Sequence, residues 1–162
     1  NEMSTGLSVV QSALAKFPGG KFTFPHTWVL GELALAQVKC GEFGASRMAI
    51  DQAIKSAEMD EEGWCLPELY RLKGECLLVE GGPESLAAAR RLFLRSVDVA
   101  QQQKALSWEL RAAISLAKLG KRSGEDGHLA RLAIAQGQFT EGFHTADLCE
   151  ARELLIDNGR SA

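Results

Sequence analysis

The sequence predicts an all-α fold, an α-solenoid of about eight antiparallel helices. Apolar residues recur at helical spacing along nearly the whole chain, and no stretch alternates between apolar and polar residues as a half-buried strand does. Glycines and prolines divide the chain into segments of helical length that are joined by short turns. Small residues also return at a regular offset, which indicates stacked helix pairs and not a simple bundle.

Residues that start or end helices define the first four segments. These helices are expected over about 4–17, 27–40, 43–59 and 67–80. A turn at Pro18 ends the first helix, and Thr27 is a suitable N-cap for the second. Gly41 supplies the left-handed residue that stops the second helix. The acidic turn 60–63 closes the third helix. Pro67 suits the first turn of the fourth helix, which the turn Gly81-Gly82-Pro83 ends.

The last four helices are expected over about 83–103, 105–119, 125–135 and 145–158. The fifth helix carries an apolar stripe that we expect to be buried, formed by Leu86, Ala89, Leu92, Phe93 and Val97. Gly120 is the expected stop of the sixth helix. Glycines weaken the start of the seventh helix, and Thr145 is the expected cap of the eighth.

Alignment of the sequences of successive helix pairs defines the expected domain organisation. The small residues of the first pair are Ala34, Ser46 and Ala53, and those of the second are Gly74, Ala89 and Ser96. Small residues in such a register let the two helices of a hairpin approach closely. We expect a single domain over 1–162, divided into a truncated half repeat (1–20), three repeats (24–60, 64–104 and 105–137) and a C-terminal capping helix (145–159).

Tyr70, Gly74, Ala89, Phe93 and Ser96 together resemble the tetratricopeptide repeat. In that repeat an aromatic residue, a small residue four positions later and an A-x-x-x-F-x-x-A pattern in the second helix support a stack of helical hairpins. The period of this chain is longer than the ~34 residues of that repeat. The resemblance therefore implies tetratricopeptide-like hairpins with longer helices.

A second resemblance covers the chain over about 24–155. The phrases PELYRLKGECLL (67–78), SWELRAAISLA (107–117) and FTEGFHTADLCEA (139–151) are similar to the C-terminal repeat region of large bacterial signal-transduction ATPases and transcriptional regulators. Such proteins often carry a nucleotide cyclase or winged-helix domain at the N-terminus, followed by an NTPase. The resemblance implies a piece of a multidomain protein whose catalytic or DNA-binding parts lie upstream.

Composition excludes several classes of function. The formal net charge of -3 disfavours nucleic-acid binding, because a protein that binds phosphates needs a basic surface. No run approaches the ~18 apolar residues of a membrane span, and the first residues do not resemble a secretory signal. Cys40, Cys65, Cys76 and Cys149 have neither metal-ligand nor redox-motif spacing, so we expect reduced thiols in small apolar sites of a cytoplasmic protein.

Motifs for catalysis are absent from the sequence. Gly20 and Lys21 precede Phe22 where a phosphate loop needs a hydroxyl, and the 44–46 segment lacks the second glycine of a nucleophile elbow. We therefore predict no catalytic residue, no cofactor, no metal site and no enzyme activity in this segment. A small polar site formed by Glu141, His144 and Asp147 is a weaker alternative.

The expected function is non-catalytic binding through a concave face. In the tetratricopeptide arrangement the first helix of each pair lines that face, which would expose Lys39, Glu68, Arg71, Glu75 and Glu109. Arg71 has the guanidinium geometry to clamp a carboxylate or a phosphate, and its acidic neighbours favour a basic partner segment. We expect a protein partner or upstream domains of the same polypeptide to bind there. A further, structural interpretation is that the exposed end helices associate with a second copy of the chain. The alternative is a small-molecule sensor with a pocket between helical hairpins.

Overall fold

The computed structural model describes residues 2–16, 24–59, 63–123 and 127–159, and all regular structure in these ranges is helical. The eight α-helices found there are α1 (Glu2–Lys16), α2 (Phe24–Lys39), α3 (Phe43–Met59), α4 (Leu66–Glu80), α5 (Ser85–Gln103), α6 (Leu106–Ser123), α7 (Gly127–Gly137) and α8 (Ala146–Gly159). A short 3₁₀ turn, η1 (Gly63–Cys65), precedes α4. The predicted all-α class is therefore confirmed for the described residues. None of these helices combines the length and apolar character of a membrane span.

Several helix ends lie where the turn residues predicted them. Gly41 follows α2 with a φ of 81°, and Gly81 follows α4 with a φ of 79°. A side chain is strained at such angles, so glycine is the residue that these two turns need. Pro67 lies in the first turn of α4, where its missing N–H costs no helical hydrogen bond. The turns predicted at Pro18 and at 60–62 lie outside the described residues.

Two predicted helix boundaries are wrong. Thr27 is not an N-cap, because α2 begins at Phe24 and Thr27 is buried inside the helix. Gly120 does not stop α6, which continues to Ser123. Gly120 is buried, and α6 packs against the four helices α4, α5, α7 and α8. This packing outweighs the ~1 kcal/mol that glycine costs inside a helix.

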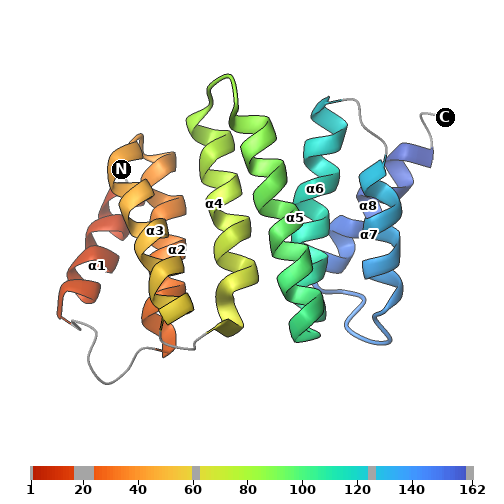
Figure 1. The fold of residues 1–162 in the computed structure, drawn as a ribbon, viewed down its shortest axis with the longest axis horizontal. Helices are drawn as coiled ribbons and strands as arrows, with labels where there is room; N and C mark the ends of the chain where they lie inside the picture. The colour runs from red at the N-terminus through yellow and green to blue at the C-terminus, as the bar shows by residue number, and fades with distance from the viewer. Residues whose placement is uncertain (1, 17–23, 60–62, 124–126, 160–162) are drawn as a thin grey trace.

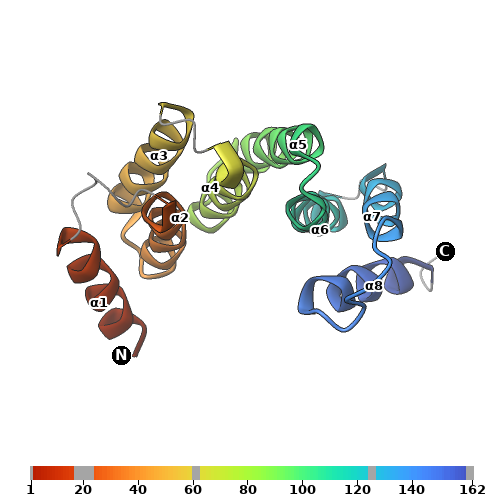
Figure 2. The same cartoon turned by 90° about the horizontal axis from the view of Figure 1, so that it is seen from below.

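The helices follow one another in chain order across the molecule (Figure 1). Each helix from α2 to α8 packs against the helix before it, and α2, α4, α6 and α8 also pack against one another in succession. Seen from below, the row is bent, so that α1 and α8 turn toward the same side (Figure 2). We call the inner side of this bend, formed by α2, α4, α6 and α8, the inner face. The helices α3 and α5 lie on the opposite, outer side (Figure 2).

The hydrophobic core extends along the row in three clusters. Ile50 and Leu72 belong to the first cluster, which joins α1 to α4. Phe93 lies in the second cluster, between α5 and α6. Leu132 and Leu148 belong to the third cluster, which joins α6, α7 and α8. Each helix thus buries its apolar side chains against helices that are near it in the sequence.

The small residues of the predicted repeat are buried. They are Ala34, Ser46, Ala53, Gly74, Ala89 and Ser96. A Cβ atom added to Gly74 would lie 2.4 Å from Cε1 of Phe93, so α4 and α5 approach as closely as that glycine allows. The Ser46 hydroxyl donates a hydrogen bond to the carbonyl oxygen of Ala34 at 2.8 Å. Ser46 therefore joins α3 to α2.

Two expectations about burial are wrong. Leu86 is 43% exposed and Leu92 is only partly buried, whereas Ala89, Phe93 and Val97 of the same predicted stripe are fully buried. Leu86 lies in the first turn of α5, at the edge of a cavity described below. Cys40 does not fill an apolar site, because it lies exposed in the turn after α2.

Cys40 is exposed to solvent whereas Cys65 and Cys76 are not, and this difference predicts how fast each thiol reacts. Cys65 and Cys76 are buried, and burial raises the pKa of the Cys76 thiol above its ordinary value. Because the thiolate is the reactive form, we expect iodoacetamide to label Cys40 at least about tenfold faster than Cys65 or Cys76 in the native protein. Mass spectrometry after timed labelling measures these rates. Equal rates in the native protein would contradict the burial, and equal rates in urea are the control.

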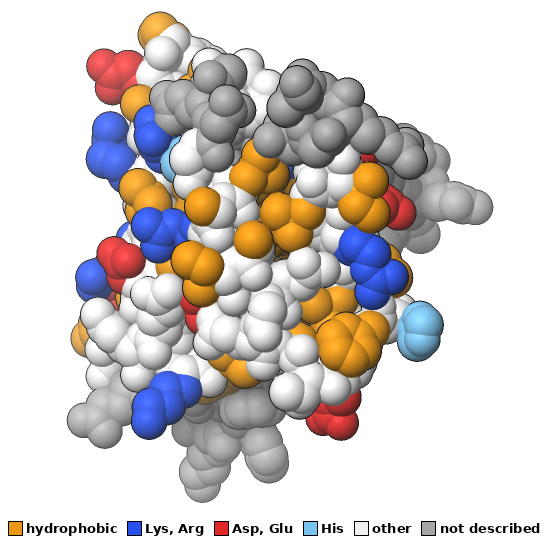
Figure 3. Space-filling model, turned by 90° about the vertical axis from the view of Figure 1, so that its right-hand side faces the viewer, with side chains coloured by type: hydrophobic (Ala, Val, Ile, Leu, Met, Phe, Trp, Pro, Cys, Tyr) orange, Lys and Arg blue, Asp and Glu red, His pale blue; other side chains and the backbone are white. Residues whose placement is uncertain are grey.

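The α7–α8 end of the row exposes large hydrophobic side chains. Ile134 on α7, Phe143 in the following turn and Ile156 on α8 are all exposed. Figure 3 views the molecule from this end, with hydrophobic side chains spread between charged ones. Self-association remains a prediction, and these three residues are candidates for its contacts.

Candidate functional site

The inner face carries charged side chains from α4 and α6. Glu68, Arg71 and Glu75 follow one another at spacings of three and four residues on α4, so they lie on one side of that helix. Arg111 and Ser115 share one side of α6 for the same reason. Because α4 and α6 pack against each other, the two sets of side chains meet.

Glu68 is the centre of the resulting network. Its carboxylate accepts hydrogen bonds from Nε and Nη2 of Arg71 at 2.8 and 2.7 Å. Nη2 of Arg111 lies 2.9 Å from the same carboxylate. Nη1 of Arg71 also reaches Glu75 at 3.4 Å, and the Ser115 hydroxyl donates to Glu75 at 2.7 Å. One carboxylate thus binds two guanidinium groups and joins α4 to α6.

The environment keeps Arg71 charged. Burial disfavours the guanidinium charge, but hydrogen bonds to Glu68 and the attraction of Glu68, Glu75 and Glu32 outweigh burial and raise the pKa of Arg71. The Glu68 side chain is fully buried, whereas Arg71 and Arg111 retain part of their exposure. The two arginines therefore offer partly exposed positive charge at the surface of the inner face.

The expected exposure of two of the five predicted site residues is wrong. Glu68 is 1% exposed and Glu109 is 4% exposed. Glu68 is covered because it lies between the two arginines. Glu109 accepts hydrogen bonds from Gln101 at 2.8 Å and from Gln138 at 3.4 Å. Each carboxylate thus links side chains from different helices. The charge pattern of a single helix does not reveal such contacts.

The structure brings together three of the five predicted residues, Glu68, Arg71 and Glu75. Lys39 is exposed at the last residue of α2, and no hydrogen bond or ion pair links it to that group within the described ranges. Glu109 lies near the start of α6, with its own glutamine partners. Of the five predicted residues, three therefore form one group on α4, where α6 packs against it.

Further charged residues of the site were missed at the sequence level. Lys118 on α6 lies 2.6 Å from Glu150 on α8, and Arg111 lies 4.0 Å from Asp147. Lys118 continues the series of Arg111 and Ser115 at spacings of four and three residues, which was the available signal. Asp147 and Glu150 are spaced for one side of α8. The pairing itself depends on how α8 packs on α6 and is not readable from either segment alone.

These side chains surround a cavity of about 90 Å³ on the inner face. Its lining consists of Arg71 and Glu75 from α4, Arg111, Ile114, Ser115 and Lys118 from α6, and Asp147 and Glu150 from α8. Basic and acidic groups are present in equal number. The cavity therefore offers hydrogen-bond donors and acceptors to a peptide segment that carries neighbouring basic and acidic side chains.

The alternative polar site of Glu141, His144 and Asp147 is not assembled. His144 lines a separate cavity with Phe143 in the turn before α8, whereas Asp147 faces Arg111. Glu141 is exposed, and no described contact links it to the other two. Within the described residues, no group of three His, Cys, Asp or Glu side chains is arranged to hold a metal ion.

The fold and the site together define an all-helical protein with a charged inner face. Comparison with protein-family models, with curated proteins and with solved structures found no match for the chain in any of the three. The function must therefore be argued from the geometry of the chain itself.

Proposed function

We propose that this chain is a non-catalytic, tetratricopeptide-like α-solenoid segment of a bacterial cytoplasmic regulatory protein. It binds a protein partner, or other domains of its own polypeptide, through the inner face. The succession of packed helices α2, α4, α6 and α8 supports this proposal, because it forms one continuous surface. The close approach of Gly74 to Phe93 supports the proposed helical hairpins.

The observation that carries the proposal is the charged cavity shared by three successive helices of the inner face. Its lining comes from α4, α6 and α8, so an extended peptide along this face would meet charges from each helix in turn. Lys118 and Glu150 are half-exposed and can exchange their mutual contact for contacts with a partner. Complementary charge of this kind selects partners and fixes their register.

Lys118 is the residue to change when this proposal is tested, because Arg71 holds the buried carboxylate of Glu68. Loss of binding in an Arg71 variant would not separate a damaged fold from a damaged surface. We expect Lys118→Glu to weaken binding of a captured partner about tenfold, because it reverses one charge of the cavity. The measurement is a pull-down from lysate of the source organism and with the other domains of the same polypeptide, followed by titration of the recovered partner.

Two variants serve as controls for this experiment. Lys121→Glu makes the same charge change three residues along α6, where Lys121 pairs with Asp157 outside the cavity lining. It should leave binding unchanged. The double variant Lys118→Glu, Glu150→Lys restores an opposite-charge pair between α6 and α8. It should still bind weakly if the partner depends on which charge lies on which helix. Equal binding by Lys118→Glu and wild type, or no partner for wild type, would refute the proposal.

A further inference from the structure

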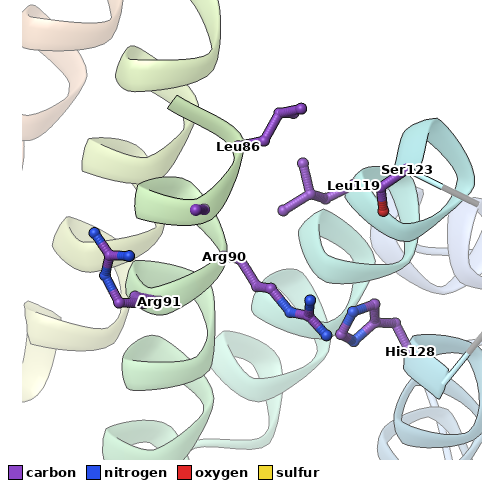
Figure 4. A pocket seen from close by; sticks show the side chains of 7 residues that line it. Leu86, Arg90, Arg91, Leu119, Ser123 and His128 are labelled. Atoms are coloured by element: carbon purple, nitrogen blue, oxygen red, sulfur yellow. The ribbon is translucent and has the colours of Figure 1, made fainter. Parts of the chain in front are cut away.

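Helix α6 lines two cavities, which differ in whether their charged groups are already engaged. The larger cavity, of about 450 Å³, lies between α5, α6 and α7. Figure 4 shows Leu86 and Leu119 extending toward each other across it, and Arg90 pointing toward His128. Arg90 and His128 both have interaction partners already. The charged cavity of the inner face instead contains a guanidinium, that of Arg111, with hydrogen-bond donors to spare.

The guanidinium of Arg111 is held in place from two sides. Its Nη2 atom lies 2.9 Å from the Glu68 carboxylate, and its Cζ atom lies 5.5 Å from the centre of the Trp108 ring. An arginine that stacks on an aromatic ring and binds a buried carboxylate loses much of its conformational freedom. A group that binds Arg111 therefore does not have to order that side chain first.

The contact between Arg111 and α8 is loose. The Nε atom of Arg111 lies 4.0 Å from Oδ2 of Asp147, which is too far for a hydrogen bond. Lys118 and Glu150, by contrast, lie 2.6 Å apart. The Arg111 side chain is 30% exposed and that of Asp147 is 44% exposed, so a partner can reach both. Asp147 is therefore a counter-charge that a better-placed carboxylate can replace.

The acidic groups of α4 beside Arg111 are more fully engaged. Glu68 is fully buried between Arg71 and Arg111. Glu75 accepts hydrogen bonds from Arg71 and from Ser115. The surface next to Arg111 thus has unused donors, whereas the carboxylates of α4 already have donors of their own. A segment that brings a negatively charged acceptor fits this surface better than a basic one.

We infer that the partner of the inner face places an acidic side chain on Arg111, and that Asp147 competes with it for this guanidinium. The inference rests on the proposed function, because it names the chemistry of the group that the inner face binds. A direct hydrogen bond from Arg111 to the partner's carboxylate replaces the 4.0 Å contact to Asp147. Three carboxylates also line the cavity, and they repel a singly charged carboxylate less than a phosphate with about two charges.

Titration of the full chain with three acetylated and amidated peptides of equal length tests the inference. The probes are hexaglutamate, hexaglutamine and hexalysine. We expect hexaglutamate to bind most tightly and to shift the indole N–H resonance of Trp108, because Arg111 stacks on that ring. Trp108→Phe identifies this resonance among the three tryptophans of the chain. Tighter binding of hexalysine, or no binding of hexaglutamate, would overturn the inference.

Variants of Asp147 test the competition directly. Asp147→Asn removes the competing charge and should tighten hexaglutamate binding about two- to fivefold, as expected for loss of an exposed ion pair. Asp147→Glu keeps the charge and should bind hexaglutamate no more tightly than wild type. Asp157→Asn is the matched control, because it removes the same charge from α8 at a residue outside the cavity lining. It should change the affinity less than about twofold.

Asp147 also lies in the first turn of α8, where a negative charge stabilises the helix. That structural role alone predicts weaker or unchanged binding for Asp147→Asn, which would overturn the inference. Equal tightening in Asp147→Asn and Asp157→Asn would reflect net charge alone and overturn it as well. If Lys118→Glu weakened hexaglutamate binding while Asp147→Asn did not tighten it, only the assignment of Arg111 would be wrong. If neither variant changed the affinity, the probe would bind outside the inner face, and the proposed function would lose support together with the inference.

Discussion

Replacing Glu68 by alanine should lower the free energy of unfolding by about 3 kcal/mol, because it takes the main counter-charge from the largely buried guanidinium of Arg71 and leaves only the longer contact to Glu75. The Glu68 side chain is fully buried and binds both Arg71 and Arg111. Without that carboxylate the two guanidinium groups face each other across the junction of α4 and α6. Urea unfolding followed by far-UV circular dichroism measures the change in stability.

The pair Lys118–Glu150 provides the control for the Glu68 prediction. Its side chains are 50% and 42% exposed, so water screens the interaction. Glu150→Ala should therefore change the free energy of unfolding by about 1 kcal/mol or less. If Glu68→Ala cost no more than Glu150→Ala, the network would contribute nothing beyond an ordinary surface ion pair. The proposed role of Glu68 in joining α4 to α6 would then be wrong.

The expected stability difference between these carboxylates also bears on function. Glu68 is committed to holding Arg71 and Arg111, whereas Glu150 and Lys118 keep much of their surface for a partner. A partner would therefore contact Lys118 and Glu150 directly, and Glu68 would affect binding only through its contacts with the arginines. Substitutions of Lys118 or Glu150 therefore test binding affinity, whereas substitutions of Glu68 test the stability of the fold.

Much of the fold could be predicted from the sequence because helix signals are local. The stops at Gly41 and Gly81 depend on one residue and its backbone angle, and both lie where the sequence placed them. The stop predicted at Gly120 was wrong because α6 packs against four other helices, and this packing keeps the chain helical past the glycine. The helix boundaries that failed are those where tertiary contacts overrode the local preference.

The candidate site was less predictable because it depends on the packing of helices that are distant in the sequence. The spacing of Glu68, Arg71 and Glu75 placed them on one side of a helix, and they do form one group. That spacing could not reveal that Arg111, which comes 43 residues after Glu68, would reach the same carboxylate and cover it. Burial of a charged residue follows from the register between two helices, and single-helix periodicity carries no information on that register.

Substitution of Gly74 by alanine should destabilise the protein by about 1–3 kcal/mol, the usual cost of overpacking a core. Helix propensity alone predicts the opposite sign, since alanine is favoured over glycine by ~1 kcal/mol in a helix. The new Cβ would lie 2.4 Å from Cε1 and 2.9 Å from Cδ1 of Phe93, so the ring must move. Phe93 is fully buried between α5 and α6 and has little room to do so.

Gly6 supplies the matched control, because it lies inside α1 with no other atom within 4 Å of an added Cβ. Gly6→Ala should raise the free energy of unfolding by up to ~1 kcal/mol, so the two glycine substitutions are expected to have opposite signs. A double-mutant cycle identifies the cause. Gly74→Ala combined with Phe93→Leu should be more stable than the sum of the single effects by about 1–2 kcal/mol, because the smaller side chain makes room for the methyl group. If Gly74→Ala stabilised the protein as Gly6→Ala does, α4 and α5 would not approach as closely as described. The helical hairpin proposed for α4 and α5 would then have to be revised.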